Sequence, residues 1–401
     1  MKEKVRYTDF LKDVLVLSVS CFGGPQAHFA HFEHLLVEKR KYLTEEELIE
    51  VNALGQVLPG PTSTQTLTAI AYRLGGPNLA YLTLLIWMLP SVIIMTAAGM
   101  LIASFQAKQI SLQFTRFIQP MAVGFIAYSA FVIINKTVKH KRTFIIMLLA
   151  GILSFIIQSP YIFPTILLIA GCVTAFNYKA HPREPKRKVE VYWSNLFLWI
   201  GVLIFAALLG SLTKATPELL PIRLFENFYR NGSLVFGGGS VLTPMLYTEF
   251  VQFKKYLSSE DFLSGYALVQ ALPGPVYSFS SYIGAISMSP FGKSGEMLGA
   301  VSAAAGIFLP GTFLIFFMIR VWDRLKSFRA IRASLEGILA ANAGLVATAA
   351  VILFLPLVKD EPLKNILLNT GITLATLALT LFTRVPSWAV IAGGLILGVV
   401  L

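Results

Sequence analysis

The sequence predicts an all-α polytopic membrane protein made of two inverted homologous repeats. About 13 membrane crossings are expected, and two of them are helices broken at Pro-Gly-Pro. The first observation is composition: the 401 residues are 55% hydrophobic and 13% charged, with mean hydropathy +0.69. A soluble chain with so few charged residues could not cover its surface. The second is a series of apolar stretches near the ~20 residues that a crossing needs. The third is the recurrence of Pro-Gly-Pro 214 positions along the chain.

Apolar stretches along the chain are predicted as membrane helices, because isolated strands leave backbone groups unpaired in lipid. Two further stretches, 44–76 and 258–286, are too polar and too interrupted for ordinary spans, and each contains one Pro-Gly-Pro. The ordinary spans are 10–36, 79–104, 117–135, 144–157, 161–178, 194–212, 224–250, 297–319, 331–355, 366–382 and 388–401.

An internal repeat gives the domain organisation. At an offset of 214, residues 22–61 and 236–275 share 15 identities in 40 ungapped positions, including Phe-Gly-Gly, Lys-Tyr-Leu and Leu-Pro-Gly-Pro. Generic apolar composition does not align such motifs, whereas internal repeats are common in transporters. We expect a first repeat over 1–178, a basic cytoplasmic linker over 179–193, a linking transmembrane helix over 194–213 and a second repeat over 214–401.

The formal charge of +12 is read as an orientation signal across a bilayer, and no nucleic-acid partner is expected. If both broken stretches cross once and the N-terminus is cytoplasmic, 22 of the 33 Lys and Arg lie inside, 10 outside and Arg230 within a span. Re-entrant broken stretches reduce the best split to 18 against 14. The crossing arrangement is therefore favoured, although it puts 39–41, Lys-Arg-Lys, on the wrong side. Equivalent points of the two copies are then separated by seven crossings. Because seven is an odd number, the two copies are inverted. The polar N-terminus lacks a signal-peptide core.

Each Pro-Gly-Pro should interrupt a helix, because proline lacks the N–H donor and pushes the preceding residue toward extended geometry. Helices over 45–58 and 62–74 are expected to meet at the first break, and a helix is expected to begin near Pro275 after the second. A helix N-terminus carries about half a positive charge and unpaired N–H groups. With hydroxyl side chains beside it, such an end is an anion-binding site. The alternative is a loop between interfacial helices.

The two Phe-Gly-Gly elements lie inside apolar spans and are interpreted as further unwound stretches facing the breaks, or as close helix packing. The residues predicted to bind the anion come from both halves. They are Gly23, Gly24, Pro25, Gln56, Pro59, Gly60, Pro61, Thr62 and Ser63, with Gly237, Gly238, Gly239, Ser240, Gln270, Pro273, Gly274, Pro275 and Ser278.

Ionisable residues within apolar runs are candidates for proton coupling or charge balance. They are His28, Arg73, Arg230 and Glu249, with a packing histidine, a snorkelling arginine and an Arg230–Glu249 pair as alternatives. Cys21 and Cys172 give neither a disulfide framework nor a metal site, and no cofactor is expected.

These motifs, Phe-Gly-Gly-Pro-x-Ala-His with Leu-Pro-Gly-Pro and Phe-Gly-Gly-Gly with Gln-Ala-Leu-Pro-Gly-Pro, resemble the two halves of the long, two-domain form of the chromate ion transporter family. The resemblance covers nearly the whole chain. It implies a multi-pass protein of the bacterial inner membrane that exports chromate, driven by the proton motive force, with halves of opposite orientation. It also implies that sulfate, a similar dianion, is a possible substrate.

Three alternatives stay open from the residues alone. One is uptake or exchange of sulfate or another oxyanion. Another is a membrane enzyme acting on lipid-linked phosphate, which would need a nucleophile, a metal cluster or a carboxylate pair within the membrane, and the sequence offers none. A non-catalytic scaffold is disfavoured, because broken helices are costly without a purpose. The oligomeric state is open, and a homodimer is possible. The expected partners are the dianion, protons and the lipid bilayer.

Overall fold

The computed structural model describes residues 6–178, 193–236, 239–325 and 328–400, and within these ranges the chain forms helices and turns without any strand. Six of the described helices are long and apolar enough to cross a membrane, and Ile162–Ala175 and Ser387–Val400 are shorter apolar helices. The prediction of an all-α polytopic membrane protein is confirmed. Residues 179–192 of the linker, and Gly237 and Gly238, lie outside the described ranges.

The chain divides into two compact units, each of three segments. Unit 1 comprises Met1–Met100, Lys188–Gly239 and Leu272–Asp323, and unit 2 comprises Leu101–Arg187, Ser240–Ala271 and Arg324–Leu401. Each unit therefore combines parts of both sequence halves.

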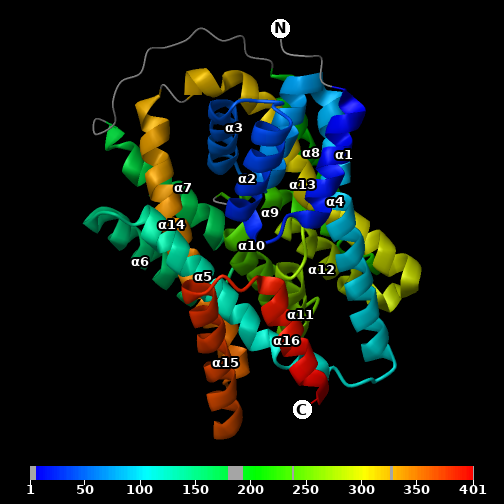
Figure 1. The fold of residues 1–401 in the computed structure, drawn as a ribbon. Helices are drawn as coiled ribbons and strands as arrows, with labels where there is room; N and C mark the ends of the chain where they lie inside the picture. The colour runs from blue at the N-terminus through cyan, green and yellow to red at the C-terminus, as the bar shows by residue number, and fades with distance from the viewer. Residues whose placement is uncertain (1–5, 179–192, 237–238, 326–327, 401) are drawn as a thin grey trace. The chain divides into compact units, whose positions relative to one another are not determined.

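Unit 1 is built from the N-terminal helices and the middle of the chain (Figure 1). In chain order its helices are α1 Tyr7–Ser20, α2 Gly24–Phe32, a π-helix Glu33–Lys39, α3 Glu45–Val57, the part of α4 Thr62–Ala107 up to Met100, α8 Ser194–Leu212, α9 Leu220–Leu234, α12 Phe279–Ser287 and most of α13 Gly292–Leu325.

The segment 10–36 is not one continuous helix, and that prediction is wrong. The chain breaks between α1 and α2, where Gly23 has a φ of 93°, and then returns alongside α1 as far as Asp13. Arg40 Nη2 donates to Asp13 Oδ1 at 2.8 Å, and Tyr42 Oη donates to Asp13 Oδ2 at 2.6 Å. A straight helix would separate positions 13 and 40 by ~40 Å at 1.5 Å per residue. The segment is therefore a helical hairpin whose two ends meet.

The broken stretch 44–76 also folds back on itself. As predicted, α3 ends before Pro-Gly-Pro and α4 begins at Thr62, and α4 is interrupted again at Gly75 and Gly76. Across the break, Arg73 Nη2 lies 3.2 Å from Glu50 Oε2, and Thr66 Oγ1 lies 3.4 Å from Asn52 Oδ1. Contacts at two levels make this an antiparallel hairpin of two helices.

Unit 2 holds the remaining helices, and α14 packs against α5, α6 and α7 within it (Figure 1). Small residues allow this close packing: a Cβ at Gly344 would lie 2.1 Å from Met147 O, and one at Gly337 would lie 2.1 Å from Ala170 O. The helices are α5 Ile118–Thr137, α6 Lys141–Ile156, α7 Ile162–Ala175, α10 Gly239–Leu246, a π-helix Tyr247–Phe253, α11 Ser259–Gln270, α14 Arg329–Phe354, α15 Leu363–Phe382 and α16 Ser387–Val400.

Local backbone structure recurs at the offset of 214 that the sequence shows. In both halves a π-helix precedes a turn, a capping box opens the next helix, and a glycine with positive φ forms the break. The matching features are the π-helices Glu33–Lys39 and Tyr247–Phe253, the positive φ of Lys41 and Lys255 (53° and 55°), the caps Thr44 and Ser258, and Gly60 and Gly274 (φ 118° and 90°).

Candidate functional site

The breaks of the two halves are tied together inside unit 1 by a reciprocal pair of backbone hydrogen bonds. Gly60 N–H donates to Val235 O at 2.8 Å, and Gly274 N–H donates to Cys21 O at 2.8 Å. Each acceptor is the residue immediately before a Phe-Gly-Gly, and donors and acceptors are both 214 positions apart. Each Pro-Gly-Pro turn is thus held by the Phe-Gly-Gly element of the other half.

Glycine is required at both turns. Gly60 and Gly274 have φ of 118° and 90°, a region that residues with a side chain rarely adopt. A Cβ at Gly60 would also lie 2.9 Å from Gln65 Nε2 and 3.2 Å from Gly311 Cα. A Cβ at Gly274 would lie 3.3 Å from Ser91 Oγ. The Gly60 turn therefore lies against the segment that follows Pro310, and the Gly274 turn lies against the segment that follows Pro90. Neither turn leaves room for a side chain.

The first helix N-terminus is polar and enclosed. Thr62, Ser63 and Thr64 are 6%, 6% and 1% exposed, and the first amides of an α-helix have no acceptor within the helix. Gln65 Nε2 donates to Pro59 O at 2.7 Å. Among the described residues, Gln65 Oε1 is buried without a hydrogen-bond partner.

The second N-terminus carries a matching set of buried hydroxyls. After Pro275 the chain makes a 3₁₀ turn Val276–Ser278 and then enters α12, so the predicted start near Pro275 is confirmed with a tighter first turn. Tyr277 Oη, Ser278 Oγ and Ser280 Oγ are buried and have no partner within the described part of the chain. Buried polar atoms without partners are costly, and they mark places where water or a ligand completes the hydrogen bonding.

His28 connects α2 to the first N-terminus. Its Nδ1 lies 3.0 Å from Ser63 Oγ, and its ring packs edge-on against Trp87 with 5.4 Å between ring centroids. Trp87 Nε1 in turn donates to Thr64 Oγ1 at 3.0 Å. His28 Nε2 is buried without a partner among the described residues. This histidine contacts the candidate anion site directly.

The other ionisable candidates have partners elsewhere. Arg73 pairs with Glu50, Arg230 Nε lies 3.0 Å from Glu226 Oε1, and Glu249 Oε1 lies 3.3 Å from Lys254 Nζ. These ion pairs favour structural roles for all three residues.

Several predicted site residues differ in exposure. Gln56 is exposed and Gln270 is partly buried, so neither matches the enclosed Gln65, which the repeat comparison did not single out. Gly23 is exposed and Gly24 is partly exposed. They follow closely after Cys21, whose carbonyl oxygen accepts the hydrogen bond from Gly274.

The remaining predicted residues are placed by the ends of helices and by the two turns. Gly239 and Ser240 begin α10, and Pro25 lies in the first turn of α2, whereas Gly237 and Gly238 fall outside the described residues. Pro59, Pro61 and Pro273 flank the two glycines, and Gly60 and Gly274 use their own amides on carbonyl oxygens.

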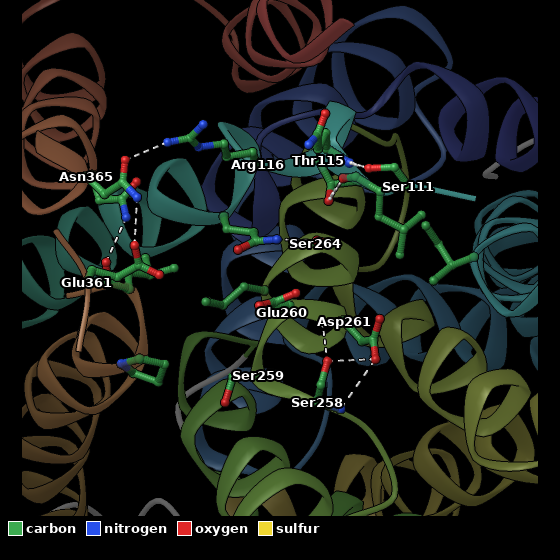
Figure 2. Close-up of a pocket in the computed structure, with 18 residues that line it drawn as sticks. Ser111, Thr115, Arg116, Ser258, Ser259, Glu260, Asp261, Ser264, Glu361 and Asn365 are labelled. Carbon is green, nitrogen blue, oxygen red and sulfur yellow. Dashed lines mark hydrogen bonds between the residues drawn. The ribbon is translucent and has the colours of Figure 1, made fainter. Parts of the chain in front are cut away.

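A polar cavity of about 490 Å³ in unit 2 has the wrong charge for an anion. It is lined by Glu260, Asp261 and Glu361 against the single cation Arg116, which donates to Asn365 Oδ1 at 2.8 Å (Figure 2). Ser258 and Asp261 form the capping box of α11 at its edge. The candidate anion site is therefore taken from the two helix N-termini of unit 1, with their buried hydroxyl and amide groups.

Comparisons with known proteins agree with the motifs. The profile of the family described as "Chromate transporter" matches residues 8–176 and 222–399, two segments that begin 214 positions apart. A "Chromate transport protein" of Cupriavidus metallidurans is 26% identical over 385 residues, which cover 94% of this chain and 89% of that protein. A "Probable chromate transport protein" of Synechococcus elongatus is 27% identical over 90% of this chain and 86% of its own length.

An uncharacterized transporter of Methanocaldococcus jannaschii is 23% identical over 86% of this chain and 83% of its own length. No solved structure matches the chain. The chain is a transporter, not an enzyme, and it belongs to the chromate transporter family.

Proposed function

We propose that this protein exports chromate across the bacterial inner membrane, driven by the proton motive force, and that it binds the dianion where the broken helices meet. The family and the names of its relatives support chromate as the substrate. The observation that carries the site is the reciprocal pair of hydrogen bonds from Gly60 to Val235 and from Gly274 to Cys21. Each bond ties one Pro-Gly-Pro turn to the other half of the chain, which supports a site that draws on both polar helix starts.

The groups at these helix starts suit a tetrahedral dianion. Its four oxygens accept hydrogen bonds, and the helix ends offer amide donors, the hydroxyls of Ser63, Tyr277, Ser278 and Ser280, and partial positive charge. An unpaired double charge in a medium of low dielectric constant is prohibitive, so several donors are needed. Binding by dipoles, with no full cation cage, also lets the anion leave.

The two halves are proposed as inverted repeats with nine crossings in place of thirteen. In this topology the segments 7–76 and 220–287 re-enter without crossing, and the crossing helices are α5–α8, α13–α16 and the part of α4 after Gly76. The contacts of Asp13 with Arg40 and of Glu50 with Arg73 support the first two hairpins. With the N-terminus cytoplasmic, 23 Lys and Arg lie inside and 10 outside. The run Lys39-Arg40-Lys41 then joins the cytoplasmic side, and five crossings between equivalent points keep the halves inverted.

The reciprocal bonds supply the closed state of the cycle. Breaking one bond of the pair lets one hairpin tip move and opens the site toward that hairpin's side, while the other bond keeps the opposite side shut. His28 is the proposed proton carrier, because it contacts Ser63 at the first helix start and its Nε2 has no partner among the described residues. A proton on Nε2 adds a positive charge beside the dianion, and its loss weakens binding.

The test is chromate and sulfate flux into everted membrane vesicles with and without a pH gradient, acid inside. We expect chromate uptake that the gradient accelerates and that Gly60→Leu and Gly274→Leu abolish. Gly201→Leu is the matched control, because Gly201 is a helical glycine of α8 with no atom within 4 Å of its Cβ position. Normal chromate flux in both break variants would refute the site, and sulfate flux without chromate flux would refute the substrate.

A further inference from the structure

A wide basic cavity lies in unit 1 at the open end of the two N-terminal hairpins. Its volume is about 1080 Å³. Its walls come from the start of α1, the turn between the π-helix and α3, and the end of the 62–74 helix. The charged side chains that line it are Arg6, Lys39, Arg40, Lys41 and Arg73, against Asp9 and Glu47.

Two of these cations are available to a ligand. Arg6 lies 3.9 Å from Asp9, Arg40 pairs with Asp13, and Arg73 pairs with Glu50. Lys39 and Lys41 form no ion pair within the described part of the chain. The net positive charge of the cavity is therefore concentrated on the lysine turn.

The backbone of Lys41 is a second, independent observation. Its φ of 53° lies in the left-handed region, which glycine adopts without the steric cost that a Cβ brings. A lysine nevertheless stands there, and Lys255 stands at φ 55° at the matching position of the other half. A turn selected for backbone geometry alone would favour glycine or asparagine, so a lysine stands there at a steric cost.

The floor of the cavity faces the candidate site. Val51 and Ile70, which are 1% and 2% exposed, line the cavity. The contact between Asn52 and Thr66 lies directly beyond them, because Asn52 follows Val51 and Thr66 is one helical turn before Ile70. Thr62 lies eight residues before Ile70, which is ~12 Å along the helix. The cavity and the helix N-terminus are thus at opposite ends of one hairpin, separated by an apolar layer.

We propose that this cavity is the cytoplasmic vestibule of the transporter, in which Lys39 and Lys41 capture a free tetrahedral oxyanion before it passes the Val51–Ile70 layer. The inference rests on the proposed function and topology. Cations around a concave entrance raise the local concentration of an anion and the rate at which it associates. The acidic cavity of unit 2 has the opposite sign.

The test is equilibrium dialysis of radiolabelled chromate against the purified full-length protein in neutral-lipid nanodiscs, together with flux in everted vesicles. Lys41→Gly relieves the left-handed backbone, so a loss of binding in this variant does not come from misfolding. We expect Kd and KM for chromate to rise about fivefold in Lys41→Gly and about tenfold or more with Lys39→Gln added, at little cost in maximal rate. Salt should weaken binding to the wild type more than to the double variant.

Lys359→Gln is the matched control, since it removes one exposed lysine in unit 2 and should leave Kd and KM unchanged. An unchanged Kd, with an unchanged salt dependence, in Lys41→Gly and in the double variant would overturn the vestibule. A difference that occurs only in anionic lipid would also overturn it, because the cavity would then hold a lipid headgroup. If the wild type binds chromate through these lysines but transports none, the proposed function is refuted and the binding of an oxyanion in the cavity is supported.

Discussion

Opening of the paired breaks can be followed through a cysteine that the chain already carries. Cys21 is fully buried, and its carbonyl oxygen accepts the hydrogen bond from Gly274 N–H. Cys172 is exposed and is removed as Cys172→Ala. In this background, Gly274→Ala should loosen the break and expose the Cys21 thiol.

The magnitude follows from the geometry of Gly274. An alanine at φ 90° carries about 1 to 2 kcal/mol of backbone strain. Its Cβ would lie 3.3 Å from Ser18 O and Ser91 Oγ, a tight contact that adds to the strain. Relief of the strain requires the Gly274–Cys21 bond to open, so the open state gains about 2 to 3 kcal/mol relative to the closed one. Since 1.4 kcal/mol is tenfold, the open population should rise about 30- to 150-fold.

The assay is the rate of N-ethylmaleimide labelling at Cys21 in detergent-purified protein. When opening and closing are faster than labelling, the rate tracks the open population, so it should rise by the same factor. Gly201→Ala is the control, because a Cβ there meets no atom within 4 Å. Equal labelling rates in Gly274→Ala and Gly201→Ala would refute the view that the bond closes the site.

Further predictions concern the buried amide, the first hairpin and the topology. Gln65→Leu removes the bond to Pro59 O and should abolish chromate flux with normal membrane insertion. Gln56→Leu is the control at an exposed position and should lower chromate flux less than twofold. Equal effects of the two variants would contradict the assignment of Gln65 to the site. Asp13→Asn should destabilise the protein by about 1 to 3 kcal/mol in a detergent unfolding assay, because Arg40 and Tyr42 lose a buried carboxylate, and Asp9→Asn should have a smaller effect. A cysteine at Lys41 should react with an impermeant reagent only in everted vesicles; labelling only in intact cells would support thirteen crossings.

Elements fixed by local chemistry could be predicted from the sequence. Pro59 and Pro61 cannot continue a helix, and the hydroxyl residues after Pro61 favour a helix start, so the break and the helix over 62–74 follow from neighbouring residues. The helix over 194–212 follows from a single apolar run.

The hairpins could not be predicted in this way. Hydropathy does not distinguish one long span from two short antiparallel helices with the same residues. The direction taken after Gly23 depends on the bonds from Arg40 and Tyr42 to Asp13, between residues 27 and 29 positions apart. The expected topology put the run Lys39-Arg40-Lys41 outside, against the preference of basic residues for the cytoplasmic side. That conflict was the signal that the chain folds back after Gly23.

The candidate site could be predicted in part. Identity between the halves singles out Gly60 and Gly274, because their backbone geometry strains any residue with a side chain. The same comparison singles out Gln56 and passes over Gln65, which aligns with Phe279. The unbroken polar run from Thr62 to Thr66 in an apolar chain was the signal for Gln65. Which member of that run faces the break depends on packing against Gly311, 246 residues away.

The central claim is that the dianion binds between the two helix starts that the breaks create. The most direct measurement is an experimental structure of the protein soaked in chromate, with chromium located by its anomalous scattering. The account predicts a chromium peak within hydrogen-bonding reach of the amides at Thr62–Thr64 and of the Ser278 hydroxyl. A well-ordered peak elsewhere in the membrane core, with none at these helix starts, would contradict it.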